Sequence, residues 1–223
     1  MNEKIMLNET PVLSGMEACF NGLIDKIKSS ENPSELNDEA NKFFECVLNK
    51  FVEFFYFENA GKAIKKLHCP NLGERMVKVM DFDYAWKQYM EYLNGMKTYV
   101  DNARNKDLNT EDIKKQIEDI ILKDEDFIKS LFVYGENKNN PEKEMPLKDA
   151  INYLNIFFNV KNTAMNFKCD TYTSCPFDKL YLHSKVSVIY YASKGIVEQT
   201  RRIVDELNGD KKDCGTAIKY SVF

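Results

Sequence analysis

The sequence predicts an all-α protein, a mostly antiparallel bundle of about seven to nine helices, and three observations carry this prediction. The 223 residues include only nine Gly and six Pro, about 7% of the chain against roughly 12% on average. Sandwiches and barrels carry turn signals roughly every 8–12 residues, so this scarcity disfavours a β-rich fold. Apolar residues recur at spacings of three and four along most of the chain. Each proline falls at an expected helix start or connection: Pro11, Pro33, Pro70, Pro141, Pro146 and Pro176.

Two helices are expected in the first 57 residues. The first runs from Pro11 to about residue 29, because Thr10 is a good N-cap and proline suits the first helical position. Its buried stripe is expected to comprise Val12, Met16, Cys19, Leu23 and Ile27. The second starts at the Asn-Pro-Ser-Glu segment 32–35, which combines a cap, a first-turn proline and a glutamate, and it continues to about residue 57.

The middle of the chain is expected to hold a short, a long and an acidic helix. Asn71 is the expected cap of the short helix, whose apolar residues are Leu72, Met76 and Val79. The long helix covers about 84–104, after the Asp-Phe-Asp segment 81–83, and the acidic helix opens at Thr110. A separate turn or two is expected at 127–132.

Segment 135–146 (GENKNNPEKEMP) is polar, contains two prolines and a glycine, and is expected to be a loop. A helix should follow over 147–167, and the longest helix should run from Pro176 to about residue 208, with Gly209 at the C′ position. We therefore expect an N-terminal helical part at 1–134 and a C-terminal helical hairpin at 147–209 packed on it, or one domain made of both. Residues 210–223 form a weakly patterned tail.

The sequence favours a cytoplasmic protein, because no signal peptide is recognised, and its charge is close to balanced. The net charge is −4, from 31 basic and 35 acidic residues, which does not favour wholesale polyanion binding. The start of the chain lacks the apolar run of a signal peptide, and no long uncharged stretch predicts a membrane span. The six cysteines are therefore expected to be thiols. Abundant Lys, Asn, Phe, Tyr and Ile suit A/T-rich codons and suggest a low-GC source, such as a phage, virus or parasite.

An aromatic run is the strongest local anomaly. Seven of the fifteen residues from 43 to 57 are Phe or Tyr, and on a helix they point in too many directions for a single amphipathic stripe. One interpretation is a central helix that is covered on most sides. The other is that Tyr56 or Phe57 faces outward as an anchor for a protein partner.

Charge is spread unevenly between two segments. Residues 107–126 carry eight acids and three lysines, whereas 161–202 carry seven bases and three acids. Solvated helix faces, or packing of the two segments against each other, would explain this pattern. Alternatively, the second segment offers a basic face for phosphates, with Lys194, Arg201 and Arg202 as candidate phosphate-binding residues.

Metal and catalytic sites are not predicted. Cys169, Cys175 and His183 lack the spacing of paired zinc ligands, and motifs for nucleotide binding, a nucleophilic serine or zinc hydrolysis are absent from the sequence. Asp81 with Asp83, or the acids at 124–126, could hold a divalent ion. Acids at the start of a helix, near its positive end, are the simpler explanation for both. No cofactor is expected.

The function that these observations favour is non-catalytic: an adaptor or inhibitor-type protein that presents helical surfaces to another macromolecule, most simply a protein. The first alternative is a nucleic-acid or ribosome-associated protein that uses the basic 161–202 face. The second is a metal-dependent helical enzyme.

Overall fold

The computed structural model describes residues 9–29, 36–53, 74–104, 110–133, 140–150, 152–154 and 176–209. These ranges are mostly helical, which confirms the predicted helical character of the chain. They contain the helices α1 (Glu9–Ser29), α2 (Leu36–Glu53), α4 (Phe82–Arg104), α5 (Thr110–Phe132) and α7 (Pro176–Gly209), and the strands β1 (Met76–Met80) and β2 (Glu142–Pro146). Within them, no helix is both long and apolar enough to cross a membrane.

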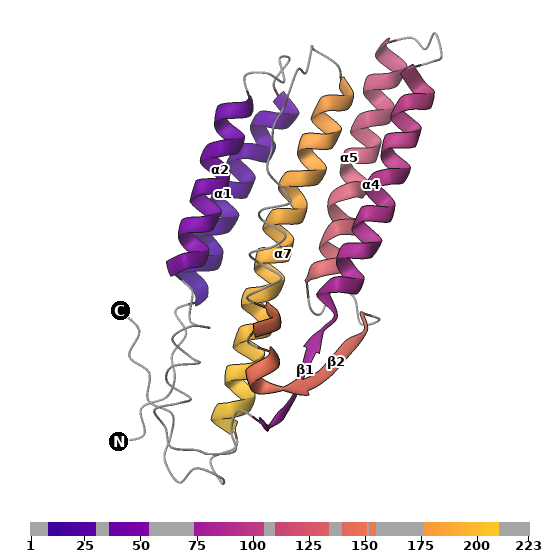
Figure 1. The fold of residues 1–223 in the computed structure, drawn as a ribbon. Coiled ribbons are helices and arrows are strands. Elements are labelled where there is room, and N and C mark those ends of the chain that lie inside the picture. The colour runs from indigo at the N-terminus through magenta and orange to yellow at the C-terminus, as the bar shows by residue number, and fades with distance from the viewer. Residues whose placement is uncertain are drawn as a thin grey trace.

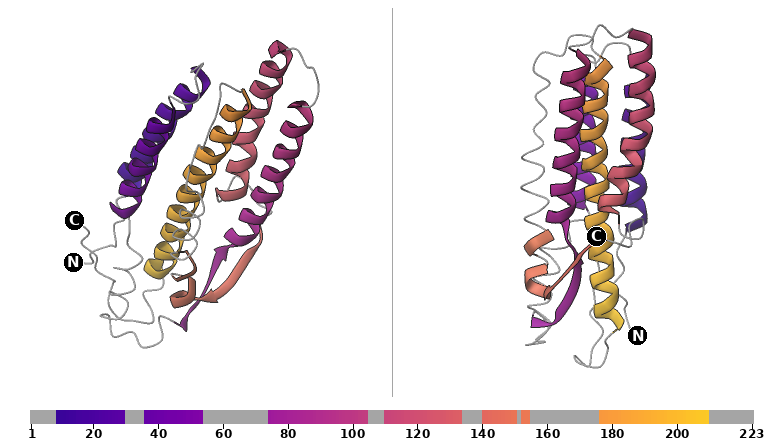
Figure 2. Two further views of the ribbon diagram at one scale, coloured as in Figure 1. Left: turned by 45° about the horizontal axis from the view of Figure 1, so that its top comes forward. Right: turned by 90° about the vertical axis from the view of Figure 1, so that its right-hand side faces the viewer.

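Helix α7 is the central element of the fold. It lies between α1 and α2 on one side and α4 and α5 on the other (Figures 1 and 2). Between residues 182 and 199, only Lys185, Lys194 and Glu198 are half-buried, and every other residue is buried. A helix enclosed on all sides needs no single apolar stripe, which explains why its apolar residues are only loosely patterned.

Packing against α7 relies on aromatic stacking and on one very close helix contact. The ring of Phe20 in α1 stacks on Tyr190 of α7, with ring centroids 4.3 Å apart and planes 9° from parallel. On the other side, a Cβ built on Gly195 would lie 2.0 Å from the carbonyl oxygen of Phe132, at the end of α5. The missing side chain of Gly195 therefore allows α7 and α5 to approach backbone to backbone.

The two strands form an antiparallel pair in which Met76 lies opposite Pro146 and Met80 opposite Glu142. The predicted short helix with Leu72, Met76 and Val79 is therefore wrong at 76–80, and the predicted loop at 135–146 is wrong at 142–146. Val77 and Val79 are buried while Met76 and Lys78 are exposed, and this alternation of β-branched residues is the period of a strand. The backbone N–H of Met80 donates to Gln199 Oε1 of α7 at 3.2 Å, so the outer edge of β1 is tied to the central helix.

Most helix boundaries agree with the sequence prediction within two residues. Helix α1 begins at Glu9, so Thr10 lies inside the helix and its assignment as N-cap is wrong. The acidic helix and the separate turns expected at 127–132 are one continuous helix, α5. Asp124 therefore lies in the second half of α5, and the explanation of residues 124–126 as helix-start acids is wrong.

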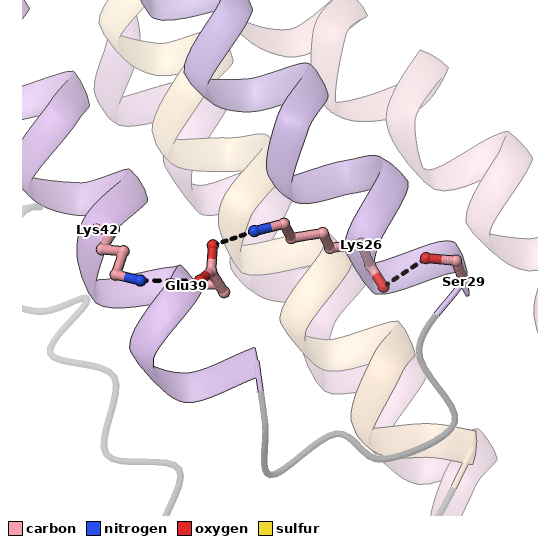
Figure 3. A network of polar contacts seen from close by, with 4 residues as sticks. All are labelled: Lys26, Ser29, Glu39 and Lys42. Carbon is pink, nitrogen blue, oxygen red and sulfur yellow. Dashed lines mark hydrogen bonds and ion pairs between the residues drawn. The ribbon is translucent and has the colours of Figure 1, made fainter.

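Two kinds of contact join α1 to α2. Cys19 and Cys46 form a disulfide with their Cα atoms 6.4 Å apart, within the usual range, so the prediction of free thiols is wrong for this pair. Figure 3 shows the second contact, in which Glu39 of α2 accepts from Lys26 of α1 and from Lys42, the latter at 2.9 Å. Both lysines lower the pKa of Glu39, although exposed ion pairs of this kind contribute little to stability.

Several expectations fall outside the described residues. They include the anchors Tyr56 and Phe57, the tail at 210–223, and most of the helix expected at 147–167, of which 147–150 and 152–154 are described and helical. The division into parts at 1–134 and 147–209 stays a prediction.

Candidate functional site

The most unusual group of side chains lies inside the contact between α5 and α7. Asp124 of α5 and His183 of α7 are both fully buried, and Asp124 Oδ2 is 2.8 Å from His183 Nδ1. Burying an ionisable pair is costly unless its members satisfy each other. The two residues are 59 positions apart in the sequence, so the pair forms only because α5 and α7 pack against each other.

Glu125 extends this pair toward the surface. Its Oε2 lies 3.8 Å from His183 Nε2, its Oε1 accepts from the hydroxyl of Tyr191 at 2.8 Å, and its side chain is 30% exposed. We call Asp124, Glu125, His183 and Tyr191 the His183 cluster. The neighbouring imidazole of His183, and less strongly the hydrogen bond from Tyr191, hold the pKa of Glu125 below its usual value despite partial burial.

The pKa of His183 reflects two opposing effects. Burial acts to lower it, but hydrogen bonding to Asp124 and the neighbouring charge of Glu125 outweigh burial, and the net pKa is raised. On α4, burial and the nearby carboxylate of Asp124 raise the pKa of Tyr92, so that its phenol stays neutral. The cluster therefore favours a positively charged imidazole between two carboxylates.

The arrangement is suited to holding a proton and joining helices rather than to binding a substrate. A general acid or base has to reach the proton that it transfers, and the side chains of His183 and Asp124 are 0% exposed. In the part of the chain that the structure describes, no group of three or more His, Cys, Asp or Glu residues could hold a metal ion.

Sequence reasoning considered His183 only as a zinc ligand and did not pair it with Asp124. One signal was present in the sequence. Asp124 occupies the apolar stripe of α5 between the buried residues Ile121 and Ile128, at spacings of three and four. A carboxylate on a buried stripe requires a buried partner, but the partner's identity depends on how α5 and α7 meet.

A second polar cluster fixes the start of α4. Asp81 caps the helix, because its Oδ1 accepts from the N–H of Tyr84 at 3.0 Å. Lys143 of β2 lies 2.9 Å from Asp81 Oδ1 and 3.1 Å from Asp83 Oδ2, and its ammonium lies 5.1 Å from the ring centre of Tyr153. The explanation of Asp81 and Asp83 as helix-start acids is therefore correct, and Lys143 forms an ion pair with each of them.

The three candidate phosphate-binding residues lie on α7 in different surroundings. Arg202 pairs with Glu142 of β2, with Nη1 2.7 Å from Oε1. Lys194 is half-buried, and the side chain of Arg201 lies outside the described residues. Lys194 and Arg202 are eight residues apart, roughly 12 Å along the helix axis, so one phosphate does not bridge them without long side-chain extensions.

The large apolar side chains that are exposed in the described ranges all belong to one stretch, β1 and α4. They are Met76, Tyr84, Met90 and Tyr99, with 50%, 44%, 37% and 39% of their surface exposed. Tyr99 also donates from its hydroxyl to Gln116 Oε1 of α5 at 2.6 Å. Tyr84 and Met90 are both exposed on α4, about 120° apart around its axis.

Comparison of the chain with models of protein families, with curated proteins and with solved structures gave no match.

Proposed function

We propose that this chain is a non-catalytic protein of the adaptor or inhibitor type, which binds another macromolecule, most simply a protein, through β1 and the outer face of α4. The observation that carries the proposal is the concentration of exposed Met and Tyr side chains on this one stretch, from Met76 to Tyr99. Met and Tyr are among the residues enriched in protein interfaces.

The rigidity of this surface supports the proposal. The capping contacts of Asp81 and the ion pairs of Lys143 hold the start of α4 in place. Tyr84 is therefore presented on an anchored first turn, and a rigid anchor loses little conformational freedom when a partner binds. Charged residues such as Lys87 and Glu91 lie between the exposed apolar residues. Charged side chains around an apolar contact are typical of the polar rim of an interface.

Site-specific photo-cross-linking tests this surface. A photo-reactive amino acid is placed at position 84 or 90 in the full-length chain and, as the matched control, at the exposed position 21 on α1. Cross-linking is carried out in host lysate with and without nuclease. A discrete protein adduct from positions 84 and 90, absent at position 21 and resistant to nuclease, is expected. Equal labelling at all three positions would contradict the proposal.

We also propose, from the sequence alone, that the chain is an antiparallel bundle of seven to nine helices, that it is cytoplasmic and that it comes from a low-GC source. The nucleic-acid alternative stays a prediction, and the described residues give it no specific support, since Arg202 is paired with Glu142. An adduct that disappears on nuclease treatment would favour it.

A further inference from the structure

We propose that His183 is a protonation-dependent clasp, which holds α5 and α7 together while its imidazole carries a proton on both nitrogens and loosens their contact when one proton is lost. The motivating geometry is a fully buried ring whose two nitrogens face two different carboxylates, Asp124 Oδ2 at 2.8 Å and Glu125 Oε2 at 3.8 Å.

Donor and acceptor counting explains why the protonated ring fits this position. A neutral imidazole has one N–H donor and one acceptor nitrogen, whereas imidazolium has two donors. If Nδ1 of a neutral ring donates to Asp124, the lone pair on Nε2 points toward the carboxylate of Glu125. Nε2 has no hydrogen-bond partner within the described residues, so what favours its protonation is charge: a proton there places a positive charge, rather than a lone pair, 3.8 Å from Glu125 Oε2.

The groups around the ring leave its charge balanced only when it is protonated. Helix α5 contributes the carboxyl groups of Asp124 and Glu125, and α7 itself contributes the hydroxyl group of Tyr191, which donates to Glu125. The titratable groups from α4 are Tyr89 and Tyr92, both kept neutral by burial. Helix α1 contributes Lys28, whose charge acts on Glu125. Deprotonation of His183 would therefore remove the positive charge that lies between the two carboxyl groups, 2.8 Å from Asp124 Oδ2 and 3.8 Å from Glu125 Oε2.

Glu125 gives the buried ring a connection to solvent. One carboxylate oxygen lies 3.8 Å from Nε2 and the side chain is 30% exposed. A side-chain rotation that shortens this distance to hydrogen-bond length would connect His183 to water without unfolding of the helices. The clasp can therefore respond to pH in the folded protein.

The direction of the pH effect follows from the raised pKa of His183 in the folded chain. The stabilisation is fully present below the ordinary histidine pKa near 6.5 and is lost as pH rises through the folded value. Between these two pH values, the folding equilibrium constant should fall by up to about tenfold per pH unit from this one group.

The chain has only two histidines, and this makes the test direct. In the full-length His68→Gln variant, His183 gives the only imidazole signals, which are followed by NMR of isotope-labelled histidine from pH 5 to 10. We expect both ring nitrogens to be protonated at neutral pH, with a midpoint above 6.5. Above the midpoint, amide exchange in α5 and α7 should increase more than the intrinsic rise with pH. A neutral ring at pH 6, or titration without any change in exchange, would overturn the proposal.

Urea unfolding at pH 6 and pH 9 provides a second measurement. The His183→Gln variant keeps one N–H donor toward Asp124 but does not titrate. The wild-type chain should lose stability between the two pH values by more than this variant does, and an equal loss in both would contradict the clasp. If His183→Gln does not fold, Asp124→Asn takes its place, and it should lower the His183 midpoint in the NMR titration.

Discussion

Gly195 of α7 lies directly against the carbonyl group of Phe132, so that a Cβ atom at position 195 would be 2.0 Å from that oxygen and 3.3 Å from Cε1 of Phe82. The carbonyl belongs to the backbone at the end of α5 and cannot rotate away as a flexible side chain could. The distance between the two helices is therefore set by the absence of a side chain at Gly195.

Gly195→Ala should therefore destabilise the protein although alanine is the better helix former. Overpacking a close contact typically costs about 1–3 kcal/mol. A Cβ atom 2.0 Å from a backbone carbonyl belongs at the upper end of this range, above the roughly 1 kcal/mol that alanine gains over glycine within a helix. Urea unfolding followed by circular dichroism measures the difference.

Two other helical glycines provide the matched controls. A Cβ on Gly22 of α1 or on Gly95 of α4 would meet nothing within 4 Å. Gly22→Ala and Gly95→Ala should therefore each stabilise the protein by about 0.5–1 kcal/mol. If Gly195→Ala also stabilises it, the close contact between α5 and α7 is not maintained in solution.

The helices could be predicted from the sequence because their signals are local. Apolar spacing and capping residues place α4 and α7 within about two residues of their observed ends. Strand β1 was missed because it has five residues and pairs with β2, more than sixty residues later. No local pattern in β1 reveals that partner.

The candidate site was harder to predict for the same reason. Asp124 and His183 are 59 residues apart, and each alone resembles an ordinary helical residue. The disulfide between Cys19 and Cys46 also depends on how α1 and α2 meet. The expectation of free thiols rested only on the predicted cytoplasmic location.

Asp81 should contribute to stability in two separable ways, as the cap of α4 and as a partner of Lys143. Asp81→Ala removes both contacts and should cost about 1–2 kcal/mol. Asp81→Asn keeps an oxygen that can accept from the N–H of Tyr84, so it should cost only a few tenths of a kcal/mol, the usual contribution of a partly exposed ion pair. Thermal unfolding of both variants, with Lys143→Met as the control for the ion pair alone, tests this order. Equal losses for Ala and Asn would mean that the cap contributes nothing.

The disulfide between Cys19 and Cys46 joins two residues that are 27 positions apart and so closes a loop of the chain. In the chain-entropy model, a loop of this length corresponds to roughly 3–4 kcal/mol of stabilisation. Dithiothreitol should lower the unfolding midpoint of the wild-type chain and leave that of the Cys19→Ser, Cys46→Ser double variant unchanged. A thiol assay should find two more reactive groups in the reduced, denatured chain than in the oxidised one. Equal thiol counts would show that the pair is not bonded, as is usual for cytosolic cysteines.

Tyr191 should stabilise the protein in a pH-dependent way, because its hydroxyl donates to the ionised carboxylate of Glu125 at 2.8 Å. Tyr191→Phe removes this hydrogen bond and keeps the ring that packs against Phe20, with centroids 5.6 Å apart. At pH 7 the variant should be less stable by about 1–2 kcal/mol, at the low end for a charged acceptor because Glu125 is partly exposed.

The stability difference between wild type and Tyr191→Phe at acid pH distinguishes loss of this hydrogen bond from a packing effect. The folded pKa of Glu125 is lowered from its usual 4.5, so the stabilisation is present above pH 4.5 and is lost as pH falls through the folded value. The difference between wild type and Tyr191→Phe should therefore shrink below pH 4.5, as measured by urea unfolding at pH 7, 5 and 3. If the variant is destabilised only by poorer packing, the stability difference will be the same at all three pH values. If it is destabilised by loss of the bond to an ionised Glu125, the stability difference must decrease as pH falls.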